Sequence, residues 1–325
     1  MEERKKDVPL LEVKGLKKYF VSKSGKAKKT VQALNGISFT IREGETFGLV
    51  GESGCGKTTA GRVISCLTEP TAGEVFFQGE NLFQMSKKEL KKVRKEIQMV
   101  FQDPFASLDP RMTIGKIIEE PLVIHKISDK AGRKQMVLEM LEKVGLQPEY
   151  YNRYPHEFSG GQRQRIGIAR ALILRPKLVI CDEPVSALDV SVQSQILNLL
   201  EDLQEELGLT YIFIAHGLNV VQHISDRIGV MYLGKIAEII SADELFAHPG
   251  HPYTKALLSA NPIPNPEIQH ERIILEGDIP SPANPPSGCF FHTRCKECRQ
   301  ICKEQEPPVR QNGDRMVACH FPLEK

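Results

Sequence analysis

Eight residues near the start of the chain have the types and spacing of a phosphate-binding loop. The run Gly51-Glu52-Ser53-Gly54-Cys55-Gly56-Lys57-Thr58 fits the pattern G-x4-G-K-[ST]. Glycines let successive backbone N–H groups curl around phosphate oxygens, and the start of the following helix adds positive potential. The lysine reaches the β- and γ-phosphates, and the hydroxyl after it is a ligand for Mg²⁺. The segment therefore predicts binding of a nucleoside triphosphate with Mg²⁺.

A second motif supplies the carboxylates that this chemistry needs. Residues 178–181 are apolar and are followed by Asp182 and Glu183. We expect Asp182 to lie beside Thr58 and to hold the Mg²⁺, directly or through water. Glu183 is the candidate general base or water-orienting residue. The pair indicates that the bound nucleotide is hydrolysed.

A third motif points to a second chain. Residues 158–164 read FSGGQRQ and precede a helical pattern. A Ser-Gly-Gly turn at the start of a helix is another anion site by the same physics. Because one phosphate-binding loop does not need two cradles, we expect this one to serve a nucleotide held by another chain.

The elements that must position these motifs are typical of an α/β fold. Residues 11–50 contain strands, and KLVICDEP and TYIFIAHG have the continuous apolar pattern of buried parallel strands. A helix is predicted after Gly56, and amphipathic helices over 130–145 and 191–207. We interpret the polar stretch 21–34 as a loop. The basic stretch 85–96 is predicted to be a solvent-exposed helix, with contact to anionic lipid or a partner as the alternative.

Taken in order, the motifs resemble those of the nucleotide-binding subunit of ABC transporters. GESGCGKT, Gln102 in MVFQDP, FSGGQ, LVICDEP, SALD and Ala215-His216 occur in the family's order across residues 11–240. In that family two subunits sandwich two ATP molecules head to tail. The resemblance implies an α/β P-loop ABC ATPase fold, with a RecA-like core, an antiparallel β subdomain and an α-helical subdomain.

The resemblance also implies a role for each site residue. Catalysis would use Lys57, Gln102, Glu183 and His216, with His216 sensing the γ-phosphate and stabilising charge in the transition state. Phe20 would stack on the adenine, with Tyr19 as the alternative. The Mg²⁺ ligands would be Thr58, Gln102 and Asp182. The other residues expected at the nucleotide are Gly51, Ser53, Gly54, Cys55, Gly56 and Thr59 in the loop, and Ser159, Gly160, Gly161 and Gln162 in the second cradle.

Two further positions follow from the same resemblance. Asp189, after Ser186-Ala187-Leu188, would couple the two nucleotide sites across the dimer. The chain departs from the family at Gly217, which follows His216 where the family usually has Asp. Glycine is permissive in its backbone conformation, so this departure bears on how firmly the loop holds His216.

Composition separates a main body from a tail. Of the 21 prolines, 12 lie from Pro249 onward, and 5 of the 8 cysteines lie between Cys289 and Cys319. We therefore predict an ATPase domain over residues 1–250, with its helical subdomain at about 103–170, and an extension over 251–325. Clustered cysteines without a secretory signal favour a metal or redox role. The spacing suits zinc or an iron–sulfur cluster equally, and free buried thiols are the remaining alternative.

The tail resembles the C-terminal extension of dipeptide and oligopeptide permease ATPases. The segments that carry this resemblance are HPYTKALL, NPIP and GDIPSPANPPSGCFFHTRC, and other runs look like the second (F-type) ATPase of that system. Some members of that family hold a [4Fe–4S] cluster by cysteines. The matching positions are Cys289, Cys295, Cys302 and Cys319. Cys298 is additional, which leaves open either a different choice of ligands or zinc.

The resemblance implies an ATPase subunit that powers import of dipeptides or oligopeptides across the cytoplasmic membrane. Its partners would be a D-type ATPase in a heterodimer, two transmembrane permease subunits and, through the complex, an extracytoplasmic peptide-binding protein. The chain has no apolar run near the ~18 residues of a membrane span. We therefore expect peripheral binding at the cytoplasmic face, with the spans on other chains.

Three alternatives differ in class or substrate. The first is a nickel importer ATPase of the same family, because no residue of such an ATPase contacts the transported solute. The second is a soluble ABC ATPase acting on nucleic acid or the ribosome, which the net charge of +2 and the lack of heptads disfavour. The third is a binding-only subunit, which the complete set of catalytic residues disfavours.

Overall fold

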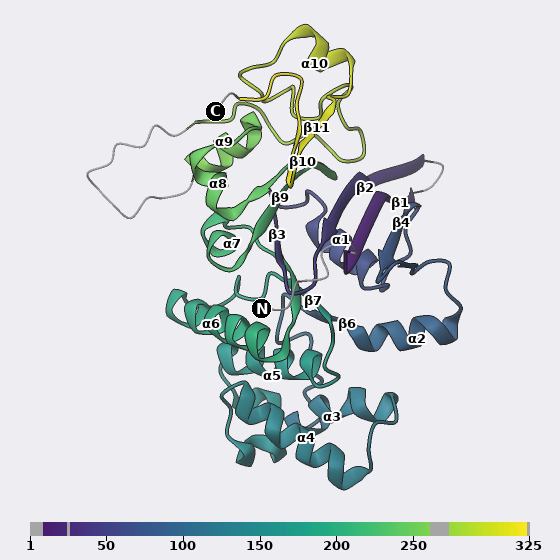
Figure 1. Cartoon of the computed structure of the whole chain (residues 1–325), viewed down its shortest axis with the longest axis vertical. Coiled ribbons are helices and arrows are strands. Elements are labelled where there is room, and N and C mark those ends of the chain that lie inside the picture. Colours follow the sequence, from purple (N-terminus) through teal and green to yellow (C-terminus); the bar gives the residue numbers. More distant parts are fainter. Residues whose placement is uncertain (1–8, 25–26, 261–272, 324–325) are drawn as a thin grey trace, which may run out of the picture. The chain divides into compact units, whose positions relative to one another are not determined.

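The computed structural model describes residues 9–24, 27–260 and 273–323. The chain forms two compact units, one of residues 1–84 with 213–325 and the other of residues 85–212. Figure 1 shows strands and helices in both units, so the predicted α/β class is confirmed.

The first unit begins with a four-stranded antiparallel sheet. Its strands are β1 (Leu11–Ser24), β2 (Ala27–Ile41), β4 (Ala72–Phe77) and β5 (Glu80–Asn81), in the order β2-β1-β4-β5. The prediction of a loop over residues 21–34 is wrong, because most of that stretch belongs to the β1–β2 hairpin, where Phe20 pairs with Val31. Phe20 and Val21 are 46% and 52% exposed. This outer part of the hairpin buries neither face at its described residues, so it lacks the alternating pattern by which half-buried strands are recognised.

A second group of strands in this unit carries the nucleotide loop. Its order is β11-β12-β10-β9-β3, and β3 and β9 run parallel. Every residue of β3 and β9 is buried. The strands are β3 (Thr46–Val50), β9 (Arg227–Tyr232), β10 (Lys235–Ser241), β11 (Val309–Asn312) and β12 (Arg315–Ala318). The helices are α1 (Lys57–Ile64), α7 (Leu218–Ile224), α8 (Ala242–Ala247), α9 (Pro252–Ser259) and α10 (Gln300–Glu304).

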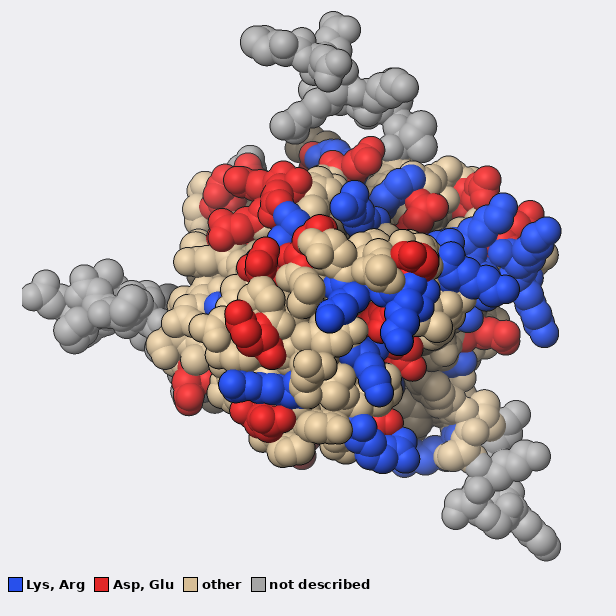
Figure 2. Space-filling model, turned by 90° about the horizontal axis from the view of Figure 1, so that it is seen from below, with Lys and Arg blue, Asp and Glu red and all other residues tan. Residues whose placement is uncertain are grey.

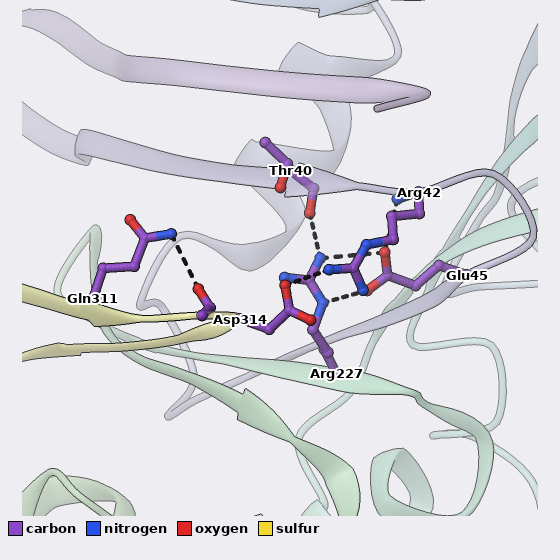
Figure 3. Close-up of polar contacts among 7 residues, drawn as sticks. Thr40, Arg42, Glu45, Arg227, Gln311 and Asp314 are labelled. Atoms are coloured by element: carbon purple, nitrogen blue, oxygen red, sulfur yellow. Dashed lines mark hydrogen bonds and ion pairs between the residues drawn. The ribbon is translucent and has the colours of Figure 1, made fainter. Parts of the chain in front are cut away.

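The C-terminal hairpin β11–β12 is part of this sheet. Strand β12 pairs with β10, where Glu238 lies opposite Val317. Figure 3 shows the polar contacts near the turn of the hairpin, where Asp314 forms an ion pair with Arg42. Beside it, Arg227 donates to the Glu45 carboxylate at 2.6 Å and to a backbone carbonyl at 2.6 Å. Residues from both sides of position 250 therefore pack in one unit.

The second unit contains the remaining strands and most of the long helices. Strands β6 (Ile97–Val100) and β7 (Leu178–Asp182) are parallel, and all five residues of β7 are buried. The predicted helices over 130–145 and 191–207 are confirmed as α4 and α6. The other elements are α3 (Ile114–Ile124), α4 (Lys130–Lys143), 3-10 helices Pro148–Asn152 and Pro155–Glu157, α5 (Gly160–Leu172), α6 (Val190–Leu207) and β8 (Thr210–Ile214). Strand β8 begins in this unit and its last residues belong to the first unit.

The basic segment of this unit is an exposed helix, as predicted. Helix α2 (Lys87–Glu96) begins at a capping box in which Ser86 and Glu89 satisfy each other's backbone N–H groups, and none of its ten residues is buried. Figure 2 shows one face of the molecule, on which Lys and Arg gather toward one side while Asp and Glu are interspersed elsewhere. In the described part of the chain, no helix combines the length and apolarity that crossing a membrane would require.

Candidate nucleotide site

Steric contacts explain the glycines of the phosphate-binding loop, which joins β3 to α1. A Cβ at Gly51 would lie 2.1 Å from the Met231 carbonyl oxygen, and one at Gly56 would lie 2.3 Å from the Ala33 carbonyl oxygen. Gly56 also has φ 110°, where an L side chain is strained. A larger residue at either position would push the loop off the strands behind it. The close approach keeps the loop backbone free to face a phosphate.

The lysine of the loop is held by that same backbone. Lys57 is 4% exposed, and its Nζ donates to the carbonyl of Gly51 at 2.7 Å and to that of Glu52 at 3.3 Å. The neighbouring Cys55 thiol is buried, and burial raises its pKa, partly offset by the charge of Lys57. Cys55 is therefore a protonated packing residue, whereas Lys57 is a cation at the centre of the loop.

The predicted carboxylates lie at the end of β7, in the second unit. Asp182 and Glu183 are 2% and 5% exposed. Glu183 has φ 49°, an unusual conformation for a residue with a side chain, and such strain concentrates at functional sites. The Gln102 side-chain amide donates to Glu183 Oε2 at 2.6 Å. The structure thus brings Gln102 and Glu183 together. Thr58 lies in the other unit, so its meeting with Asp182 stays a prediction.

The second predicted cradle forms the start of α5. Ser159 is the N-cap, and it forms a capping box with Gln162. A Cβ on Gly161 would lie 2.5 Å from Val192 Cγ1, so glycine lets the turn pack against α6. Asp189 is the N-cap residue of α6. The anion-binding geometry expected of the motif, a helix N-terminus behind a Ser-Gly-Gly turn, is present.

The two remaining predicted residues lie in the first unit. His216 follows β8 and is exposed. Gly217 has φ −87°, and among the described residues no atom lies within 4 Å of a Cβ built there. The backbone therefore does not require glycine at this position. On β1, Phe20 is 46% exposed with Lys18 Nζ 5.1 Å from its ring centroid, and the Tyr19 hydroxyl donates to Asn35 Oδ1 at 2.9 Å. Which of the two rings stacks on adenine stays a prediction.

The four predicted cysteines of the tail line one cavity of about 10 Å³, together with His292 and His320. Cys298 is not among the described residues that line it. Burial raises the pKa of Cys289 to about 11 and that of Cys295 to about 12, and it also raises that of Cys319. In the described residues, no group of three or more His, Cys, Asp or Glu side chains has the arrangement of a metal site.

Sequence reasoning missed two residues that contact the loop. Arg294, beside Cys295, donates to both carboxylate oxygens of Glu52 at 2.8 and 3.1 Å. The Tyr253 hydroxyl, from α9, accepts a hydrogen bond from the Glu52 backbone N–H at 3.0 Å. Arg294 and Tyr253 both lie more than 200 positions from Glu52 along the chain, so no local sequence pattern predicts these contacts.

The glycine-rich loop before a helix, the buried Asp-Glu pair after a strand and the second cradle define the class as a P-loop nucleotide-binding protein. The sequence pattern of the ABC transporter family matches residues 34–186, and that of the oligopeptide/dipeptide transporter C-terminal region matches residues 237–302. The fold resembles the dimeric structure of a post-hydrolysis state of the ATP-binding cassette MJ0796 bound to ADP and Pi. The TM-score is 0.64 at 32% identity, over 71% of this chain and 98% of that one.

Two relatives match almost end to end. The chain is 55% identical over 319 residues to the oligopeptide transport ATP-binding protein AppF of Bacillus subtilis, covering 96% of this chain and 97% of that protein. It is 52% identical over 320 residues to the dipeptide transport ATP-binding protein DppF of Haemophilus influenzae, covering 98% of each. The chain therefore belongs to the ABC transporter family of ATP-binding proteins, which are ATPases, and the predicted fold is confirmed.

Proposed function

We propose that this protein is the ATPase subunit that powers import of dipeptides or oligopeptides through partner transmembrane subunits. The observation that carries the proposal is the near end-to-end match to oligopeptide and dipeptide transport ATP-binding proteins, which includes the transporter C-terminal region. The complete loop, with the buried cation Lys57 and the strained Glu183, supports turnover rather than binding alone.

The residue roles follow from the chemistry of phosphoryl transfer. Lys57 and His216 stabilise charge on the γ-phosphoryl group, and Glu183 orients or deprotonates the attacking water. Gln102 holds Glu183 through the 2.6 Å hydrogen bond and completes the Mg²⁺ shell. The proposed Mg²⁺ ligands are Thr58, Gln102 and Asp182, and the proposed adenine contact is Phe20. The proposed phosphate contacts are Gly51, Ser53, Gly54, Cys55, Gly56, Lys57, Thr58 and Thr59.

The second cradle is proposed to act on a partner's nucleotide. Its exposed Ser159 and the backbone of Gly161 would face the γ-phosphate bound by a second, D-type ATPase, while Asp189 links the two sites. Two permease subunits and a peptide-binding protein would complete the transporter, with this chain peripheral at the cytoplasmic face. In domain terms, residues 1–250 are the ATPase domain, with a helical subdomain at about 103–170, and residues 251–325 are the extension.

The tail cysteines are proposed to hold a [4Fe–4S] cluster, with zinc as the alternative. Cys289, Cys295, Cys302 and Cys319 line one cavity, and thiolates suit either group. The cavity now has about the room of one water molecule, so a cluster would require the side chains to move outward. The four cysteine side chains are chemically suitable ligands for either group. When bound, the cluster or zinc would cross-link the tail, and no catalytic step depends on it.

Metal analysis tests this part of the proposal. Protein purified without oxygen is expected to contain about four iron and four sulfide per chain and to absorb visible light. Cys302→Ser should lose the metal, whereas Cys298→Ser, whose thiol lies outside the cavity lining, should keep it. Colourless protein with one zinc would select the alternative. Protein with neither metal would remove the site.

Transport itself is tested in sealed vesicles that contain the co-encoded permease, the partner ATPase and the binding protein. ATP-driven uptake of a dipeptide or an oligopeptide is expected. Uptake of nickel with no uptake of either peptide would replace the peptide proposal by the nickel alternative. Lys57→Ala is the control that should abolish uptake of any solute, because it removes the cation at the γ-phosphate.

A further inference from the structure

The phosphate-binding loop carries a carboxylate of its own. Glu52 lies between Gly51 and Ser53, inside the loop that is proposed to bind the triphosphate. A bare carboxylate at this position would repel phosphate oxygens, because like charges that are close together at a protein surface oppose one another. Neutralisation of this charge should therefore favour binding of ATP.

Arg294 neutralises that charge from the tail. Its guanidinium donates to both oxygens of Glu52, the fork-to-fork geometry that makes arginine–carboxylate pairs strong and oriented. The side chains of Arg294 and Glu52 are only 8% and 22% exposed. Burial disfavours the charged guanidinium, but the hydrogen bonds to the Glu52 carboxylate and the charge of that carboxylate outweigh it and raise the pKa of Arg294. Arg294 therefore carries its charge at every physiological pH.

The surroundings hold Arg294 in position. Phe291, three residues earlier, is 2% exposed and packs edge-on against Tyr232 and tilted against Tyr253, with ring centroids 5.3 and 5.2 Å apart. The Tyr253 hydroxyl itself accepts the Glu52 backbone N–H. Aromatic packing of this kind has a defined geometry. The tail thus contacts Glu52 twice, at the carboxylate and at the backbone.

We propose that Arg294 is a positioning residue of the ATP site: by neutralising and orienting Glu52, the cysteine-bearing tail sets the affinity of the P-loop for ATP. The inference rests on the proposed function of the loop and adds a residue from outside the ATPase motifs. Arg294 need not touch the nucleotide, because it acts through Glu52. Removal of its charge should weaken ATP binding while the groups that carry out hydrolysis remain.

The test is a double-mutant cycle on the full chain, read out as the Kd of MgATP by calorimetry together with KM and kcat. Arg294→Gln leaves Glu52 unpaired, and we expect the Kd and KM of ATP to rise roughly tenfold, the size expected of one unit charge about 12 Å from an anion at a protein surface. The kcat at saturating ATP should change less than about threefold, because the reacting groups are untouched.

A double variant distinguishes neutralisation of the Glu52 charge by Arg294 from a role of Arg294 in packing alone. In the double variant E52Q/R294Q the repelling carboxylate is gone, so ATP affinity should return to within about twofold of wild type. Lys296→Gln is the matched control. Lys296 is exposed two residues away and makes no ion pair with any described residue, so its loss changes net charge equally but should leave the Kd unchanged.

The outcomes are distinct. Wild-type protein that does not bind MgATP would overturn the proposed function itself. Normal ATP affinity in Arg294→Gln would overturn the inference and leave the proposed function standing. A weakened Arg294→Gln variant that E52Q does not rescue would also overturn it, since Arg294 would then act only as a structural staple.

Discussion

The glycines of the site are best understood from the atoms that face them. Gly51 and Gly56 lie against backbone carbonyls, and Gly161 lies against Val192, so each marks a close approach of two segments. Gly167, in the same helix as Gly161, meets no described atom within 4 Å of a Cβ built on it. The two glycines of α5 therefore have different reasons to be glycine, and substitution should separate them.

Gly161→Ala is expected to destabilise the start of α5 by about 1–3 kcal/mol, because the new Cβ must displace Val192 Cγ1. ATPase activity should fall with it, since the Ser-Gly-Gly turn is the proposed cradle. Val192→Ala removes the clashing atom and should restore both stability and activity. Gly167→Ala is the control, with an expected gain of up to ~1 kcal/mol from helix propensity. Thermal unfolding and ATPase assays measure both effects. Equal behaviour of the two alanine variants would contradict the packing account.

Among the secondary-structure elements, those with local signals could be predicted from sequence and those without could not. The strand–loop–helix around Gly56 follows from an apolar run, glycines and a helical period, which all lie within about 25 residues of one another. The outer part of the β1–β2 hairpin was missed because its described side chains, at 20–22 and 29–33, are not buried on either face. The β11–β12 hairpin was missed although its turn, Gly313-Asp314, is a local hairpin signal, whereas its pairing with β10 joins residues about 80 positions apart.

The contacts of the tail could not be predicted for a related reason. The Arg294–Glu52 pair and the Arg42–Asp314 pair join residues 242 and 272 positions apart. Charged residues occur throughout this sequence, and nothing in their spacing selects one pair from the many that are possible. The cysteines were easier, because five of one rare type within about 30 residues are expected to share a site, and the family resemblance selected the four that line one cavity.

Helix α9 carries a titratable cap. His251 is its N-cap, 3% exposed, and its Nδ1 accepts the Tyr253 backbone N–H at 3.0 Å. Burial lowers the pKa of His251 to about 4. The unfolded chain takes up the proton near pH 6.5, whereas the folded chain does not until about pH 4. The folded state should therefore lose stability as the pH falls from about 6.5 to 4, by up to ~3 kcal/mol.

His251→Asn keeps an acceptor at the cap but cannot titrate. The free energy of unfolding is measured by urea titration at pH 7.5 and at pH 4.5. Its decrease between these two pH values should be about 2–3 kcal/mol smaller in this variant than in wild type. Other groups, including the buried Glu238, are common to both proteins and cancel in the comparison. The same pH dependence in both proteins would show that His251 is not buried in its neutral form.

The molecule as a whole carries two segments that are proposed to bind phosphate, the P-loop of the first unit and the Ser-Gly-Gly turn of the second. A chain that binds only its own nucleotide through the P-loop has no need of a second phosphate-binding segment. We therefore propose that the protein is half of a composite ATPase, in which ATP binding would join two subunits and hydrolysis would separate them. The tail belongs to this machinery as well, because it packs on the unit that carries the P-loop and contacts Glu52.

The measurement that tests this account most directly is the turnover and ATP affinity of Glu183→Gln, assayed with the partner ATPase. The loss of one general base should lower ATP hydrolysis at least ~100-fold, while the Kd of MgATP stays within about twofold of wild type. Glu205→Gln makes the same substitution at an exposed position of α6 and should hydrolyse ATP normally. Near-normal turnover in Glu183→Gln would contradict the central claim that Glu183 activates the attacking water.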